Sequence, residues 1–196
     1  NEQHRARISR LILNDVGPEL NKEGLIALSS YFGVTHRFNN FADLKAELTK
    51  HYASFGITRD EEWRELALHS ARRLPDGSWT YHFDPRIGEQ FIHDTPRDTW
   101  ADWANIRCPI MVIRGEASTL LDAETLPKMA EAQPTLTTLT AAGCGHAPML
   151  NTPEQVTPIR HFLNEPARAH RAAAPSTAVS SSLLSWLTKQ WRRWFH

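Results

Sequence analysis

A histidine and an aspartate stand where they could work together as a catalytic base and its supporting acid. His146 lies in a Gly-Cys-Gly-His loop (143–146) after a predicted strand, and Asp15 ends an apolar run at 10–14. The carboxyl ends of parallel strands meet at one sheet edge, where functional groups gather. A carboxylate that fixes the tautomer of an imidazole prepares it to take a proton from a nucleophile. This pattern predicts that His146 is a general base and Asp15 its orienting acid.

Both residues also have a purely structural interpretation. A histidine in a loop commonly faces solvent and does nothing else. The Asp15 carboxylate could instead accept hydrogen bonds from the backbone of residues 16–17 in an Asx-type turn. The two residues alone leave these alternatives open.

The elements that would position this pair alternate between strands and helices, which is the pattern of an α/β fold. The apolar run at 109–113 is typical of a parallel strand that is covered on both faces. The predicted elements are strands over 10–15, 109–115 and 135–141 and helices over 122–133, with Asp122 as N-cap, and 152–164. Residues 21–73 have mostly helical periodicity, including a helix over 59–73, and a short strand follows at 79–83. This block predicts an insertion or cap between the first two strands.

Three segments carry a family resemblance. They are Arg-Leu-Ile-Leu-Asn-Asp-Val-Gly-Pro at 10–18, Pro-Ile-Met-Val-Ile-Arg-Gly at 109–115 and Gly-Cys-Gly-His-Ala-Pro-Met-Leu at 143–150. In order and spacing they resemble the C-terminal half of α/β-hydrolase fold enzymes, and the match covers roughly residues 8–164. The resemblance implies that His146 is the catalytic base. It also implies that cap helices within about 19–98 shape the substrate pocket, with four aromatic residues as candidate lining: Tyr31, Phe32, Trp63 and Trp79.

The position of the acid departs from one common family pattern. Many members carry an aspartate in a Ser-Asp-x-Leu-like segment after the strand that corresponds to 109–115. Here Thr119 occupies that place and has no carboxylate. Glu116 lies beside a glycine and Asp122 is expected to cap a helix, so both are weaker candidates than Asp15. Some family members do carry the acid after the earlier strand, where Asp15 stands.

The nucleophile that the family needs has no counterpart in the sequence. The motif Gly-x-Ser-x-Gly, which forms a strand-to-helix elbow in these enzymes, occurs nowhere among the 196 residues. The expectation is a partial hydrolase domain at 1–165, inactive by itself. Either the chain is a fragment, or an upstream complementary half supplies the nucleophile.

The C-terminal segment differs from the rest in charge and composition. The whole chain has zero net charge, but residues 166–196 contain no acidic residue and five basic ones, so they carry +5 against −5 for 1–165. The Ala/Ser/Pro-rich part at 166–182 is typical of a linker. Residues 183–196 have a Trp- and Leu-rich face opposite Lys189, Arg192 and Arg193, as in an interfacial membrane helix. Docking on the protein's own body or on a partner remains the alternative.

Composition and motifs narrow the function further. The two cysteines, Cys108 and Cys144, form neither a metal-binding motif nor a disulfide framework, so no cofactor is expected. The expected location is the cytoplasm, with peripheral membrane association through the C-terminal segment. Zero net charge gives no argument for nucleic-acid binding. The resemblance implies hydrolysis of an ester, lactone or acyl bond in a small molecule. The alternative is a non-catalytic remnant, or an interaction module that binds a partner or membrane through cap and tail.

Overall fold

A three-stranded parallel sheet forms the centre of the protein. The computed structural model describes residues 7–89 and 98–165. The strands are β1 (Leu11–Asn14), β4 (Ile110–Gly115) and β5 (Thr137–Ala141), in the order β1-β4-β5. Both pairings are parallel. The three strands predicted from the sequence, and the α/β class, are therefore confirmed.

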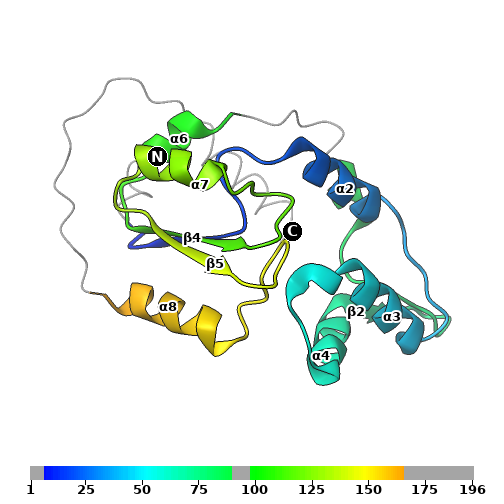
Figure 1. Cartoon of the computed structure of the whole chain (residues 1–196). Helices are drawn as coiled ribbons and strands as arrows, with labels where there is room; N and C mark the ends of the chain where they lie inside the picture. Colours follow the sequence, from blue (N-terminus) through cyan, green and yellow to red (C-terminus); the bar gives the residue numbers. More distant parts are fainter. Residues whose placement is uncertain (1–6, 90–97, 166–196) are drawn as a thin grey trace.

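Helices cover both faces of this sheet (Figure 1). Two of them, α6 (Trp100–Ala104) and α7 (Thr125–Ala132), lie on one face, and α8 (Pro153–Asn164) lies on the other. All six residues of β4 are buried, because its side chains alternate between two cores. On the α6 and α7 side, the buried residues are Trp103, Ile110, Val112, Leu121 and Met129. On the α8 side they are Met111, Ile113 and Phe162.

The helix expected at 122–133 starts later than its sequence indicates. Helix α7 begins at Thr125, and its N-cap residue, Glu124, makes no capping bond through its side chain. The Asp122 carboxylate instead accepts a hydrogen bond of 3.1 Å from the Asn21 side chain. A long-range contact, which sequence position does not reveal, thus takes Asp122 away from the helix end.

The segment between β1 and α6 forms a separate layer beside the sheet, and we call residues 21–88 the helical insertion (Figure 1). Its larger helices are α2 (Lys22–Phe32), α3 (Phe41–His51) and α4 (Asp60–Ser70), and the short turns η1 (Ala53–Phe55) and η2 (Pro85–Gly88) complete it. The helix expected to run through residue 73 ends at Ser70. The next residues form strand β2 (Ala71–Arg73), which pairs antiparallel with β3 (Trp79–Tyr81), and this pairing replaces the last helical turn.

The helical insertion has its own aromatic core. Tyr31 and Trp63 are buried in it, and Phe32 and Trp79 pack against it. Leu44 and Leu48 of α3 are fully buried in the same cluster. These aromatic side chains hold the insertion together, so their expected place along a substrate pocket stays a prediction.

All three tyrosines of the chain belong to or border this core. Burial raises the pKa of Tyr31, Tyr52 and Tyr81 above their ordinary value, with the largest effect at Tyr31. A raised pKa means that the tyrosines of the unfolded chain lose their protons at a lower pH than those of the folded chain. The contribution of these buried phenols to the free energy of unfolding is therefore complete below about pH 10 and is lost as the pH rises above it.

We therefore expect the folded protein to form no tyrosinate near pH 10. Ultraviolet absorbance should show all three phenols ionising together, at higher pH, as the helical circular dichroism disappears. The same protein in denaturant is the control, and its tyrosines should titrate near pH 10. Tyrosinate absorbance near pH 10 with intact helical signal would contradict the burial of these side chains.

Two of the predictions made from the sequence concern the C-terminal segment. The linker at 166–182 and the amphipathic helix at 183–196 lie outside the described residues. Within residues 7–89 and 98–165, no helix is both long and apolar enough to cross a membrane.

Candidate active site

Asp15 is the centre of a buried polar network at the carboxyl end of β1. Its side chain is 0% exposed, and its backbone amide donates to the Ile113 carbonyl at 2.7 Å, continuing the pairing with β4. The backbone then turns with a φ of 58°, in the left-handed region. Aspartate tolerates this region better than most residues do. The turn therefore ends the strand and leaves the carboxylate at the sheet edge.

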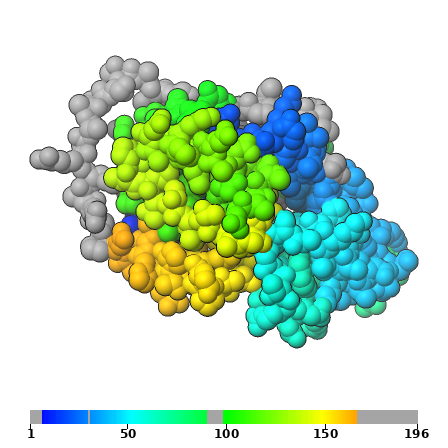
Figure 2. Space-filling model, viewed as in Figure 1, coloured from blue at the N-terminus to red at the C-terminus, as the bar shows by residue number. Residues whose placement is uncertain are grey.

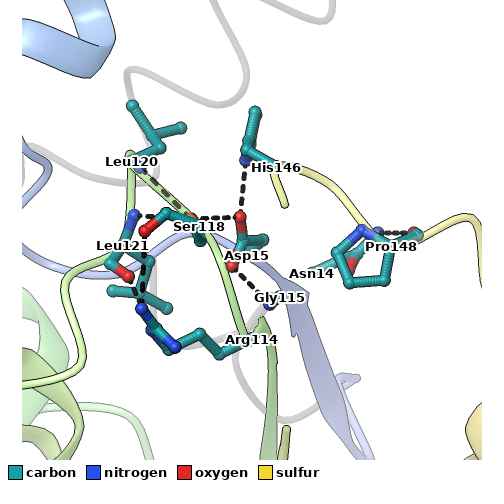
Figure 3. A network of polar contacts seen from close by, with 9 residues as sticks. All are labelled: Asn14, Asp15, Arg114, Gly115, Ser118, Leu120, Leu121, His146 and Pro148. Atoms are coloured by element: carbon teal, nitrogen blue, oxygen red, sulfur yellow. Dashed lines mark hydrogen bonds and ion pairs between the residues drawn. The ribbon is translucent and has the colours of Figure 1, made fainter. Parts of the chain in front are cut away.

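Three donors surround the Asp15 carboxylate (Figure 3). The Gly115 amide donates to Oδ1 at 2.9 Å. Oδ2 accepts from the Ser118 hydroxyl at 2.6 Å and from His146 Nδ1 at 2.9 Å. Since the carboxylate is shielded from water, these bonds replace its hydration. The structure thus brings His146 and Asp15 together as the sequence predicts, across 131 positions in the chain.

The loop that carries His146 is held from two sides. Asn14, the last residue of β1, donates through its side-chain nitrogen to the Pro148 carbonyl at 3.0 Å. From the helical insertion, the Ser54 carbonyl in η1 accepts from the Gly145 amide. The insertion accordingly lies against the loops that follow β4 and β5 (Figure 2). Contacts to the sheet and to the insertion together fix the position of the imidazole.

The other acid candidates lie elsewhere. Glu116 accepts from the Gly143 amide at 2.9 Å through its side chain, and Asp122 bonds Asn21. Among the described residues, Asp15 is therefore the acidic residue that bonds His146. Thr119, which stands where many relatives have aspartate, places its backbone carbonyl close to Gly24 at the start of α2.

Sequence reasoning missed the loop that completes the site. Ser118 supplies a donor to Asp15, and buried Arg114 holds the loop by donating to the carbonyls of Leu121 at 2.8 Å and Glu116 at 3.0 Å. Ser118 occupies the first position of the Ser-Asp-x-Leu-like pattern, whereas sequence reasoning considered only the second position, where many family members carry the acid. The pattern itself was the signal that could have found it.

The arrangement prepares His146 for proton transfer. When Nδ1–H donates to Asp15, Nε2 carries the lone pair that can take a proton. Within residues 7–89 and 98–165, Nε2 has no hydrogen-bond partner, and the His146 side chain is 23% exposed. In the same part of the chain, no cluster of histidine, cysteine or acidic residues is suited to a metal ion. The geometry is that of a general base held by an acid.

Comparison with known proteins identifies the fold family. The sequence model of the Alpha/beta hydrolase family matches residues 8–159, which include both strand-end segments of the site. The chain belongs to this family. The resemblance stated from the residues is thereby confirmed, and the three parallel strands with helices on both faces are part of the alpha/beta hydrolase sheet.

Comparison with individual proteins supports the same family assignment for this alpha/beta hydrolase. It is 32% identical over 162 residues to a 3-hydroxybutyrate-oligomer hydrolase from Cupriavidus necator, covering 78% of this chain and 55% of that one. It also matches the crystal structure of an alpha/beta hydrolase from Novosphingobium aromaticivorans, with 31% identity, a TM-score of 0.73 and coverage of 83% and 59%. E-2-(acetamidomethylene)succinate hydrolase shares the fold at 20% identity and a TM-score of 0.64, with coverage of 80% and 55%. The chain spans little more than half the length of these relatives.

Proposed function

We propose that this chain contributes the base and the acid of a catalytic triad that hydrolyses a small-molecule ester. The observation that carries the proposal is the bond of 2.9 Å between His146 Nδ1 and the fully buried Asp15 carboxylate, with Nε2 left free among the described residues. Membership of the alpha/beta hydrolase family supports it.

The chemistry follows from the roles of the two residues. Nε2 of His146 takes the proton of a serine hydroxyl while the serine oxygen attacks the ester carbonyl. The imidazolium, stabilised by Asp15, then gives that proton to the departing alkoxide, and an acyl-enzyme remains. A water molecule, deprotonated by the same nitrogen, then attacks the acyl carbon. The bond to the serine oxygen breaks, the imidazolium returns its proton to that oxygen, and the carboxylic acid product leaves.

The serine is proposed to come from residues outside this sequence. No Gly-x-Ser-x-Gly motif occurs in the 196 residues, and the chain matches only about half of its relatives. The chain is then the C-terminal part of the active hydrolase, and an upstream complementary half contributes the nucleophile.

A short hydroxy-acid ester is the proposed substrate class. The Cupriavidus necator relative is a 3-hydroxybutyrate-oligomer hydrolase. In such an oligomer, each bond joins the carboxyl of one unit to the hydroxyl of the next, so it is an ester of the kind described above. The helical insertion, which lies against the His146 loop, is proposed to act as the cap over that substrate.

A turnover assay tests this function. The 196-residue chain should show no hydrolysis of a short-chain p-nitrophenyl ester or of a hydroxybutyrate dimer. The same chain, extended by the residues that precede it in its reading frame, should hydrolyse both. Hydrolysis by the 196 residues alone, abolished in His146→Ala, would refute the proposal that the nucleophile lies outside them.

The alternative is an interaction module without catalysis, and the composition of the tail favours it as the second candidate. In that case the extended chain would also be inactive. The Trp-rich basic segment at 183–196 would then bring a cytoplasmic protein to an anionic membrane surface. Co-sedimentation with anionic vesicles by the full chain, but not by residues 1–165, would support this; equal partitioning of both would oppose it.

A further inference from the structure

We propose that Ser118 is a positioning residue for the catalytic pair, which aligns the Asp15 carboxylate for His146. The inference rests on the proposed function of that pair. Ser118 lies in the loop after β4, and its hydroxyl bonds the same Asp15 oxygen as the imidazole, so it acts on His146 through the carboxylate (Figure 3).

Ser118 shares one carboxylate oxygen with the base. Its hydroxyl donates to Asp15 Oδ2 at 2.6 Å, and His146 Nδ1 donates to the same atom at 2.9 Å. Asp15 is 0% exposed and Ser118 is 8% exposed. Water therefore has little access to replace the hydroxyl if it is removed. A buried carboxylate depends on its donors for stabilisation of its charge.

The direction of the Ser118 hydroxyl is set by its other contacts. The backbone amides of Leu120 and Leu121 both donate to Ser118 Oγ at 3.2 Å. A hydroxyl oxygen has two lone pairs and one proton. Because two amides occupy the lone pairs, the proton is left to point at Asp15.

Arg114 fixes the loop that holds Ser118. Its guanidinium is buried and donates to three backbone carbonyls of the loop, those of Glu116, Ser118 and Leu121. The forked, rigid geometry of arginine suits this multiple contact. These bonds hold the backbone of Ser118 in place, and a residue that aligns another side chain needs such a fixed position.

This arrangement makes the base sensitive to Ser118. With the hydroxyl present, the negative charge of Oδ2 is divided between two donors. Without it, His146 Nδ1–H is the only donor to that oxygen, so its bond to a charged acceptor should become stronger and its proton more deshielded. A residue that merely filled space behind Asp15 would have no such effect.

Nuclear magnetic resonance of the His146 Nδ1 proton tests the proposal on the 196-residue chain, without substrate. We expect a low-field resonance in the parent chain that is lost in Asp15→Asn, which assigns it. In Ser118→Ala the resonance should move further downfield, and in Ser118→Thr, which keeps a hydroxyl, it should stay near its original position. In the extended, active chain, Ser118→Ala should lower kcat roughly 10- to 100-fold and change KM less than about 3-fold, whereas Ser118→Thr should retain most of kcat.

An unchanged Nδ1 resonance in a folded Ser118→Ala chain would overturn the proposal, as would a threonine variant as impaired as the alanine variant. If Ser118→Ala does not fold, Ser118→Cys takes its place, since its weaker S–H donor should shift the resonance in the same direction by less. The spectroscopic result does not depend on turnover. Failure of the proposed hydrolase function would therefore appear as inactivity of the extended chain while the Nδ1 shifts remain as expected.

Discussion

Replacing Asp15 with asparagine is expected to lower kcat of the extended chain by about 10⁴-fold, with the fold intact. Oδ1 accepts from the Gly115 amide, so the asparagine oxygen should keep that place and turn its NH₂ group toward His146. An NH₂ group can only donate, which forces the imidazole to accept at Nδ1 and to carry its proton on Nε2. The nitrogen that should take the proton of the nucleophile is then blocked.

Steady-state kinetics with a short-chain ester measures this effect, and circular dichroism checks the fold. The matched controls apply the same change from carboxylate to amide at the two other acid candidates, Glu116→Gln and Asp122→Asn. Both should retain kcat within about 2-fold, because neither side chain bonds His146. If Asp15→Asn kept more than about a tenth of the activity, Asp15 would not be the acid.

Placing a single methyl group at Gly115 is expected to destabilise the protein by about 3 kcal/mol, the upper end for an overpacked site. A Cβ at this position would lie 2.2 Å from the Gly145 carbonyl oxygen and 2.8 Å from that of Cys144. These atoms belong to the backbone of the His146 loop, so no side chain can turn aside to make room. The end of β4, whose Gly115 amide donates to Asp15, and the His146 loop must therefore move apart.

Thermal unfolding of the Gly115→Ala chain should show a Tm lower by roughly 6–12 °C, given about 2–4 °C per kcal/mol for a chain of this size. Displacing the imidazole by an ångström should also lower kcat of the extended chain by about 100-fold.

Gly143→Ala is the control, since Gly143 lies in the His146 loop, which faces Gly115, and has a φ of 66° with no atom of the described residues, its chain neighbours aside, within 4 Å of an added Cβ. It tests left-handed backbone strain alone, worth about 1 kcal/mol. Equal losses in Tm for the two variants would show that crowding between the loops is not what excludes a side chain at Gly115.

Two strands of the sheet, β1 and β4, were predictable because each is a short apolar run, and β5 was predictable from its β-branched threonines. The run at 109–113 is apolar on both alternating faces, and β4 is the buried central strand as that pattern requires. The end of a parallel strand also has a defined place at the sheet edge. That rule is enough to predict that Asp15 and His146 are neighbours.

Helical periodicity and capping patterns were insufficient where another segment of the chain bonds the same groups. Asp122 looks like a helix cap, but Asn21 binds its carboxylate from across 101 positions, and α7 begins three residues later. The helix of the insertion stops at Ser70 because 71–73 pair with β3. At Asp122 a long-range hydrogen bond thus replaces the local one, and after Ser70 the pairing of a short β-hairpin replaces the helical bonds.

The α/β class, the family resemblance and two residues with the chemistry of a base and an acid all follow from the order of the amino acids. The selection of those two residues as a pair depends on how the chain folds. Three carboxylates were candidates for His146, and only the crossing of β1 beside β4 brings one of them, Asp15, to 2.9 Å from Nδ1. The role inferred for Ser118 likewise depends on a loop braced by Arg114. Hydrogen bonds act over a few ångströms, and distance in space between residues a hundred positions apart is a property of the fold.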